Sequence, residues 1–362
     1  MQDPIAVYGS TKYGAAGNCS TYLFRELNIP EATRRSLAHI SNHAIAKKTW
    51  SSYKTAEKML DRCRRETEQK LDLPLSNEST LIFVDWLLRI RKVKAGTINT
   101  YLSGIRQLHI ILGLEEPGLR SGQVSLVMKG LANLEATEKR RRVHKGRLPV
   151  TLALLKILKH RIRSQNWDTN KKLLVWAVCT MAFHGGFRIH ELLARSSSTF
   201  DPDFTLLGQD AKIQLCSIEG RQTKCIEVRV KNPKESKAGS IAIIDVFETG
   251  GQTCPVKAFE KWSSRHSKVS DKPLFSETIG KPLTGRELNK LLKGLLNDIV
   301  DYRRGSITAH SFRSGLASLM AEKGMSDEDI QIAGRWSSRA FERYIKLPRT
   351  ARARTAMKLR GL

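Results

Sequence analysis

Apolar residues recur at helical spacing over the first third of the chain. In residues 79–90, Phe83, Trp86, Leu87 and Ile90 follow the i, i+3, i+4, i+7 pattern of an amphipathic helix. Similar spacing predicts three more helices, over residues 48–65, 97–112 and 125–134. We therefore expect a small all-helical domain over residues 34–138. It follows a flexible arm, residues 1–33, which is rich in Gly, Ser, Thr and Asn.

The pattern changes in the second part of the chain. Residues 171–183 are apolar on nearly all sides, which predicts a buried helix. β-Branched and alternating apolar residues then predict three strands, over 213–215, 225–230 and 240–247. Further helices are predicted over 152–163, 256–263, 285–300, 311–322 and 327–332, and a last one carries Tyr344. We expect a second domain, residues 150–348, that is mainly α with a small antiparallel β-sheet.

The charge balance indicates a polyanionic partner. The 362 residues include 62 Lys and Arg against 35 Asp and Glu, which gives a formal net charge of +27. Such an excess favours double-stranded DNA as the partner, with an acidic membrane surface as the alternative. No apolar run approaches the roughly 18 residues of a membrane span, and the first residues do not resemble a signal peptide.

Basic residues gather between the two predicted domains, in residues 139–149. This segment has no apolar period, which is typical of a linker. We interpret it as a linker along the DNA backbone; a solvated charge run and a nuclear localisation signal remain alternatives. The DNA-contacting residues that we expect there are Lys139, Arg140, Arg141, Arg142, Lys145 and Arg147. A second basic segment, the tail 349–362, follows the second predicted domain.

The chain lacks the usual signals of a metal or cofactor. None of the six cysteines forms a C-x-x-C pair, and neither a Gly-rich nucleotide motif nor H-E-x-x-H is present. We therefore expect no cofactor and no metal.

Four residues have the chemistry of phosphodiester cleavage by a protein hydroxyl. Arg188 and Arg313 can neutralise non-bridging phosphate oxygens through forked hydrogen bonds. His310, three residues before Arg313 at the start of the predicted helix, can handle a proton near neutral pH. Tyr344 can attack phosphorus and hold the strand covalently. Each residue taken alone also has an ordinary structural explanation, such as a core tyrosine or a helix ion pair.

Neighbouring residues extend this set. Glu191 lies one turn after Arg188 and can orient its guanidinium. The turn between the second and third predicted strands carries Lys231, Lys234 and Lys237. A lysine on such a turn can protonate a leaving oxygen, although most turn lysines are simply solvated.

The order of these motifs resembles that of the tyrosine recombinase superfamily, the phage integrase-like enzymes. R-x-x-E-L, a lysine hairpin, H-x-x-R, G-R-W and Y follow one another over about residues 150–350. Gly334-Arg335-Trp336 and Thr253-Cys254-Pro255-Val256-Lys257 resemble the eukaryotic transposon branch, that is, the DIRS-like, Ngaro-like and crypton recombinases. The resemblance implies a helical core-binding domain and a mixed α/β catalytic domain that form a C-shaped DNA clamp.

The resemblance also implies residue roles. Arg188 and Arg313 would bind the scissile phosphate, and Tyr344 would form a 3′-phosphotyrosine. His310 would accept or position the tyrosine proton, and Lys234, within Asn-Pro-Lys-Glu, would protonate the leaving 5′-oxygen. No metal or ATP would be needed.

One position stays open. Counting forward from Arg313 places Trp336 where the family has a second histidine, whereas counting back from Tyr344 selects Arg335.

By resemblance we expect a site-specific DNA recombinase or transposase that works as a homo-tetramer on two DNA sites. The tail 349–362 would be a tetramer contact. The location would be nuclear if the transposon branch holds, and otherwise cytoplasmic or nucleoid. The alternatives are a type IB topoisomerase-like nicking-closing enzyme and a domesticated DNA-binding protein that does not cut.

Overall fold

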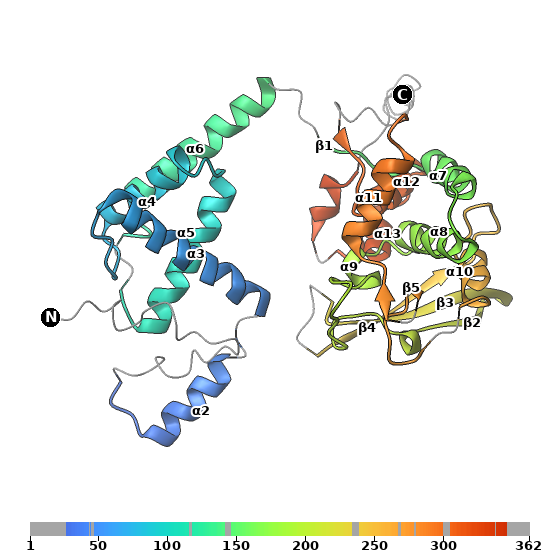
Figure 1. Cartoon of the computed structure of the whole chain (residues 1–362), viewed down its shortest axis with the longest axis horizontal. Coiled ribbons are helices and arrows are strands. Elements are labelled where there is room, and N and C mark those ends of the chain that lie inside the picture. Colours follow the sequence, from blue (N-terminus) through green and yellow to red (C-terminus); the bar gives the residue numbers. More distant parts are fainter. Residues whose placement is uncertain are drawn as a thin grey trace. The chain divides into compact units, whose positions relative to one another are not determined.

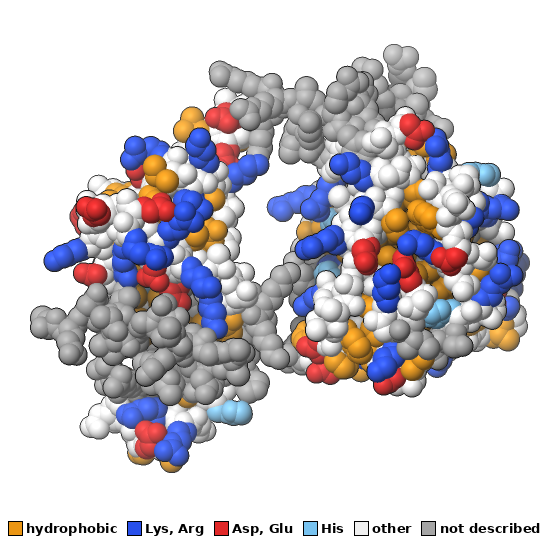
Figure 2. Space-filling view, in the orientation of Figure 1, with side chains coloured by type: hydrophobic (Ala, Val, Ile, Leu, Met, Phe, Trp, Pro, Cys, Tyr) orange, Lys and Arg blue, Asp and Glu red, His pale blue; other side chains and the backbone are white. Residues whose placement is uncertain are grey.

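The computed structural model describes residues 27–42, 44, 47–115, 118–141, 146–233, 239–266, 269–278, 280–299, 305–336 and 338–345. The chain divides into two compact units, residues 1–143 and 144–362 (Figure 1). We call the second the C-terminal unit. Lys and Arg side chains are spread over the visible face of both units (Figure 2).

The first unit is helical in its described residues. The helices are α2 (Glu31–Asn42), α3 (Lys47–Thr67), α4 (Asn77–Arg89), α5 (Ala95–Leu112) and α6 (Gly122–Arg141). Its core packs apolar faces of α3 to α6, including Phe83, Leu87 and Ile98. Gly104 lets α5 approach α3 closely, because a β-carbon there would lie 2.7 Å from the β-carbon of Ala56.

Three predictions for this region are corrected. Helix α2 begins at Glu31, inside the predicted arm; residues 1–26 lie outside the described residues. The short helix predicted over 125–134 is the 20-residue α6, which continues to Arg141 and so takes up the start of the predicted linker. At the other end of that linker, β1 (Gly146–Arg147) pairs in parallel with β7 (Gly305–Ser306).

The C-terminal unit is built around α8 (Thr169–His184), which is buried from Leu174 to Phe183. Helices α7 (Leu152–Ser164), α10 (Pro255–Ser263) and α12 (Ser311–Glu322) contact it. The remaining helices are α9 (Ile189–Leu192), α11 (Gly285–Leu295), α13 (Asp327–Gly334) and the 3₁₀ helices η2 (Gly208–Asp210) and η3 (Arg339–Arg343).

A small sheet covers one side of this core. Strands β2 (Ala211–Ile218), β3 (Arg221–Lys231) and β4 (Ile241–Phe247) are antiparallel in the order β2-β3-β4. Val228 and Val230 of β3 alternate with more exposed neighbours and point into the core. A second, short hairpin joins β5 (Ser276–Thr278) to β6 (Lys281–Pro282). The prediction of a mainly helical fold with a small antiparallel sheet is confirmed.

Two helix predictions in this unit are wrong in their extent. Helix α11 ends at Leu295, five residues before the predicted end at 300. Tyr344 does not lie on an α-helix, because the 3₁₀ helix η3 ends at Arg343 and Tyr344 follows as its C-cap residue.

Candidate active site

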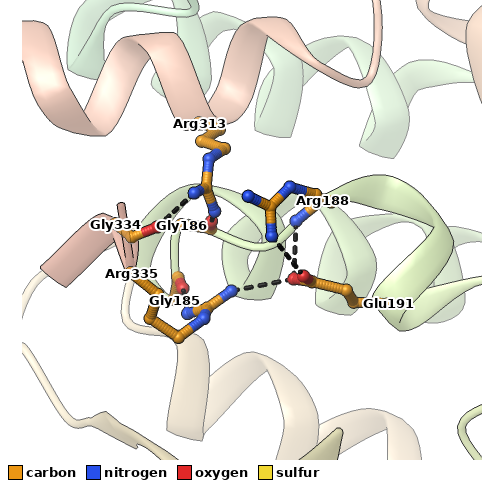
Figure 3. Close-up of polar contacts among 7 residues, drawn as sticks. All are labelled: Gly185, Gly186, Arg188, Glu191, Arg313, Gly334 and Arg335. Carbon is orange, nitrogen blue, oxygen red and sulfur yellow. Dashed lines mark hydrogen bonds and ion pairs between the residues drawn. The ribbon is translucent and has the colours of Figure 1, made fainter. Parts of the chain in front are cut away.

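Arg313 lies in the interior of the C-terminal unit. Its side chain, fully buried on α12, donates hydrogen bonds to the carbonyls of Gly186 and Gly334 (Figure 3). Burial lowers its pKa to about 10, and the positive charges of Arg188 and Arg335 add to that effect. Because this pKa is still well above neutral pH, the guanidinium stays charged. The carbonyls of two backbone turns fix its plane.

Gly315 allows α12 to take this position. A β-carbon at Gly315 would lie 2.0 Å from the Val150 carbonyl oxygen, which is closer than any side chain tolerates. Gly186 has a φ of +54°, in the left-handed region that favours glycine. The turn at Gly185-Gly186 thus presents both its carbonyls to arginines, Gly186 to Arg313 and Gly185 to Arg335.

Glu191 joins two arginines from distant parts of the sequence. Its Oε1 lies 3.0 Å from Arg188 Nη1, and its Oε2 lies 2.8 Å from Arg335 Nη2. Oε2 also accepts a 2.8 Å hydrogen bond from the backbone N–H of Arg188. Burial alone would raise the pKa of Glu191, but Arg335 and Arg188 lower it below its ordinary value. Glu191 is therefore an anion that sets the position of both guanidinium groups.

Arg335 holds the end of α13 against the turn before α9. Besides the Glu191 ion pair, its Nη1 donates a 2.9 Å hydrogen bond to the Gly185 carbonyl. Its Cζ lies 5.1 Å from the centre of the Phe187 ring. Arg335 adopts a φ of +52°, an unfavourable backbone conformation for a residue with a β-carbon. These side-chain contacts offset that backbone cost.

Trp336 stands between Arg313 and Tyr344. Its ring centre is 4.3 Å from Arg313 Cζ and 5.5 Å from the ring centre of Tyr344. The indole also covers Gly334, where a β-carbon would lie 1.6 Å from Trp336 Cζ3. The sequence Gly-Arg-Trp is therefore required locally: glycine makes room for the indole, and the tryptophan stacks on the buried arginine.

Tyr344 and His310 complete the cluster. Their ring centres are 5.3 Å apart. His310 is the N-cap residue of α12, directly before the helix start at Ser311, as the predicted bounds 311–322 imply. Burial lowers its pKa to about 4, and the charges of Arg147 and Arg313 add to this. His310 is therefore neutral at neutral pH and can accept a proton.

Two serines that the sequence analysis did not identify hold the backbone at Tyr344. Ser314 and Ser318 donate from their hydroxyls to the Tyr344 carbonyl, at 2.7 Å and 3.3 Å. They lie four residues apart and so face the same side of α12. This spacing was visible in the sequence, but serine on a helix carries no functional signal by itself.

The structure brings together Arg188, Glu191, His310, Arg313, Arg335, Trp336 and Tyr344. Lys234 and Lys237 lie outside the described residues, as do Arg142, Lys145 and the side chains of residues 139–141. Lys231 is at the end of β3, where its Nζ lies 2.7 Å from Asp210 Oδ2. Arg147 is an exposed residue of β1 whose charge acts on His310.

Within the described residues, no three His, Cys, Asp or Glu side chains cluster in a way that could hold a metal ion. No helix of the described part is long and apolar enough to cross a membrane.

Comparison with known protein families gives a match to part of the chain. Residues 220–347 match the phage integrase family. No curated protein sequence matches the chain.

Two solved structures share the fold. The XerH site-specific recombinase, bound to a palindromic difH substrate, has a TM-score of 0.56 and 14% identity over 90% of this chain and 83% of its own. The integrase of transposon Tn1549, in complex with transposon right-end DNA, has a TM-score of 0.53 and 14% identity over 91% of this chain and 98% of its own.

Proposed function

We propose that this chain, a tyrosine-type site-specific DNA recombinase with a phage integrase segment at residues 220–347, cuts DNA through Tyr344. The observation that carries this role is the placement of Tyr344. Its ring stands beside His310, which is neutral, and beside Trp336, which stacks on the buried Arg313. A phosphodiester bound at the arginines would lie within reach of the tyrosine hydroxyl.

The proposed reaction is a transesterification. The Tyr344 oxygen forms a bond to phosphorus while the bond from phosphorus to the 5′-oxygen breaks, which leaves a 3′-phosphotyrosine and a 5′-hydroxyl. Arg188 and Arg313 neutralise the non-bridging oxygens of the pentacoordinate transition state. The phosphotyrosine conserves the energy of the phosphodiester, so a 5′-hydroxyl from another strand can reverse the step and rejoin the DNA without ATP.

His310 is the proposed acceptor of the tyrosine proton. A tyrosine hydroxyl has a pKa of about 10, so attack at neutral pH needs a base or nearby cations. His310 has the right protonation state, because burial keeps the imidazole neutral. Arg313 and Arg188 contribute positive charge that favours the developing phenolate.

Trp336 is the proposed occupant of the second-histidine position. It contacts both Arg313 and Tyr344, whereas the guanidinium of Arg335 is turned to Glu191 and Gly185. Arg335 is then a positioning residue: it fixes the turn that carries Arg188 and the Gly186 carbonyl to which Arg313 donates.

Replacement of Arg335 by glycine tests this positioning role. Glycine adopts a positive φ without strain, so the substitution removes the backbone strain at this position. It also removes the side-chain contacts to Glu191 and Gly185. We expect the cleavage rate at saturating DNA to fall about 100-fold, as misplacement of a catalytic group does. The DNA concentration at half-saturation should change little. Arg335→Lys keeps the positive charge but loses the forked geometry of the guanidinium. Its cleavage rate should lie between those of the wild-type chain and Arg335→Gly. Cleavage by Arg335→Gly at the wild-type rate would show that the turn needs no such support.

Lys234 is the proposed donor of a proton to the leaving 5′-oxygen. Lys231 is a weaker candidate, because its ammonium is held by the buried carboxylate of Asp210 and by the Pro202 carbonyl at 3.1 Å. We expect Lys234→Ala to cleave normal DNA very slowly, since departure of an alkoxide needs a proton in the transition state.

A substrate with sulfur in place of the bridging 5′-oxygen identifies which lysine donates the proton. Its thiolate leaves with little protonation, so Lys234→Ala should recover cleavage on it while Arg313→Ala stays impaired. Lys231→Ala is the matched control on the same hairpin. Rescue of Lys231→Ala or Lys237→Ala alone would reassign the acid, and rescue of none would place it outside the hairpin.

The proposal also covers the branch of recombinases to which the protein belongs, its location in the cell and its assembly. The Gly334-Arg335-Trp336 and Thr253–Lys257 motifs support a place in the eukaryotic transposon branch, and with it a nuclear location. We further propose a homo-tetramer on two DNA sites, with the tail 349–362 as a contact between copies.

One assay separates this function from its enzymatic alternative. The purified chain is incubated with two duplexes that carry the DNA flanking its own coding region, and junctions are sequenced. Recombinant junctions between the duplexes are expected. Relaxation of supercoiled DNA without any recombinant junction would instead indicate a nicking-closing enzyme.

A further inference from the structure

A pocket of about 500 Å³ lies on the C-terminal unit between three helices. Its walls come from the second half of α7, the first half of α8, and the loop and first turns of α10. None of its lining residues belongs to the cluster around Tyr344. The pocket is therefore separate from the cluster around Tyr344.

The pocket is strongly basic. Five of its lining residues carry a positive charge: Lys159, Arg163, Lys172, Lys257 and Lys261. Among the described lining residues, Glu260 is the one carboxylate, and its Oε1 lies 2.8 Å from Lys224 Nζ outside the pocket. The acidic charge is thus already partnered, and the basic charges outnumber it.

The walls of the pocket differ in character. Ile162, Trp176 and Ala258 are buried apolar lining residues, so part of the surface is apolar. The nine-residue helix α10 begins beside them at Pro255, and no side chain caps its first backbone N–H groups. The positive end of the helix dipole therefore adds to the lysine charges.

The cations in the pocket repel one another. Lys159 lies partly buried, with its Nζ 2.9 Å from the Gln252 carbonyl oxygen and 5.7 Å from the centre of the Trp176 ring. Burial lowers its pKa, and the charges of Arg163 and Lys261 lower it further. A bound anion would relieve this repulsion.

We propose that this pocket binds a polyphosphate group carried by a small molecule, either a nucleoside triphosphate or inorganic triphosphate. Several adjacent anionic oxygens match five cations and an uncapped helix start. A pocket of this size suits a small ligand. The basic tail 349–362 is a poor occupant, because its charged residues are all Lys and Arg.

Isothermal titration calorimetry on the full chain with sodium triphosphate tests the proposal. We expect saturable binding to one site. Lys257→Glu should weaken it about tenfold or more, because a charged hydrogen bond becomes a repulsion. The matched control is Lys156→Glu, an exposed residue of α7 that does not line the pocket. It changes the net charge equally and should alter the affinity less than about twofold.

Further titrations distinguish the two sources of phosphate. ATP that binds more tightly than triphosphate would show that the base contacts the apolar wall, whereas equal affinities would assign recognition to the phosphates; adenosine alone should not bind. The proposal is overturned if wild-type protein shows no saturable binding, if Lys156→Glu loses as much as Lys257→Glu, or if Lys257→Glu loses duplex affinity instead. DNA cleavage, measured in parallel, should be unchanged in both variants, so failure here leaves the role of Tyr344 untouched.

Discussion

Tyr344→Phe should form no covalent complex with DNA and yet bind DNA nearly as well as the wild-type chain. The substitution removes one hydroxyl, which is the proposed nucleophile, and keeps the ring that packs beside Trp336 and His310. We expect cleavage to fall by at least about four orders of magnitude, as for other lost nucleophiles. DNA affinity should change by no more than about 1 kcal/mol, the worth of one hydrogen bond.

Denaturing gels with end-labelled duplex measure the cleavage, and a filter or fluorescence assay measures the affinity. Tyr302→Phe is a suitable control because it removes a hydroxyl from another tyrosine of the same half of the chain. A covalent complex formed by Tyr344→Phe at the wild-type rate would move the nucleophile to another residue.

Arg313→Ala should reduce the cleavage rate about 1,000-fold at saturating DNA. The guanidinium is the proposed main stabiliser of the transition-state charge, and loss of one such preorganised donor costs about this much. Arg313→Lys should recover little, because an ammonium cannot donate to the Gly186 and Gly334 carbonyls and to a phosphate in one plane.

Folding must be separated from catalysis in this case. The substitution leaves two buried carbonyls without their donor, which destabilises the turn by about 1–3 kcal/mol for each unsatisfied group. Circular dichroism on Arg313→Ala and on Arg286→Ala, an exposed arginine of α11, reports how much structure is lost. A folded Arg313→Ala that cleaves within tenfold of wild type would contradict the proposed role.

Local spacing predicted much of the fold because the periodicity of a helix or strand depends only on residues close together in the sequence. The buried α8 and the three strands of the sheet follow from apolar patterns that need no distant information. Spacing was also sufficient to propose that Glu191 contacts Arg188, because residues three apart on a helical turn lie close together. The 3.0 Å contact between the two side chains shows this.

Contacts across the sequence could not be predicted in this way. Arg335 and Glu191 are 144 residues apart, and their ion pair depends on how α13 packs against the turn before α9. Counting along the chain also left the choice between Arg335 and Trp336 open. The left-handed conformation at Arg335 sends its side chain toward Glu191, while the next residue turns toward Arg313 and Tyr344. Such a change of side-chain direction between neighbouring residues leaves no periodic pattern of apolar residues in the sequence.

The length of α6 shows a second limit. Basic residues after 138 suggested a linker, but α6 continues to Arg141, since Lys and Arg are good helix formers. The bounds predicted for α12, residues 311–322, are those of the structure, and His310 directly before them is the N-cap residue beside Tyr344.

The most direct test of the central claim is to trap the cleaved intermediate and identify its linkage. A duplex with a nick close to the cut site loses the short fragment that carries the 5′-hydroxyl, so the covalent complex accumulates. After protease digestion, mass spectrometry of the DNA-linked peptide should find a 3′-phosphate on Tyr344. Attachment through a 5′-phosphate, attachment to another residue, or nicked DNA without any linked peptide would each contradict this account.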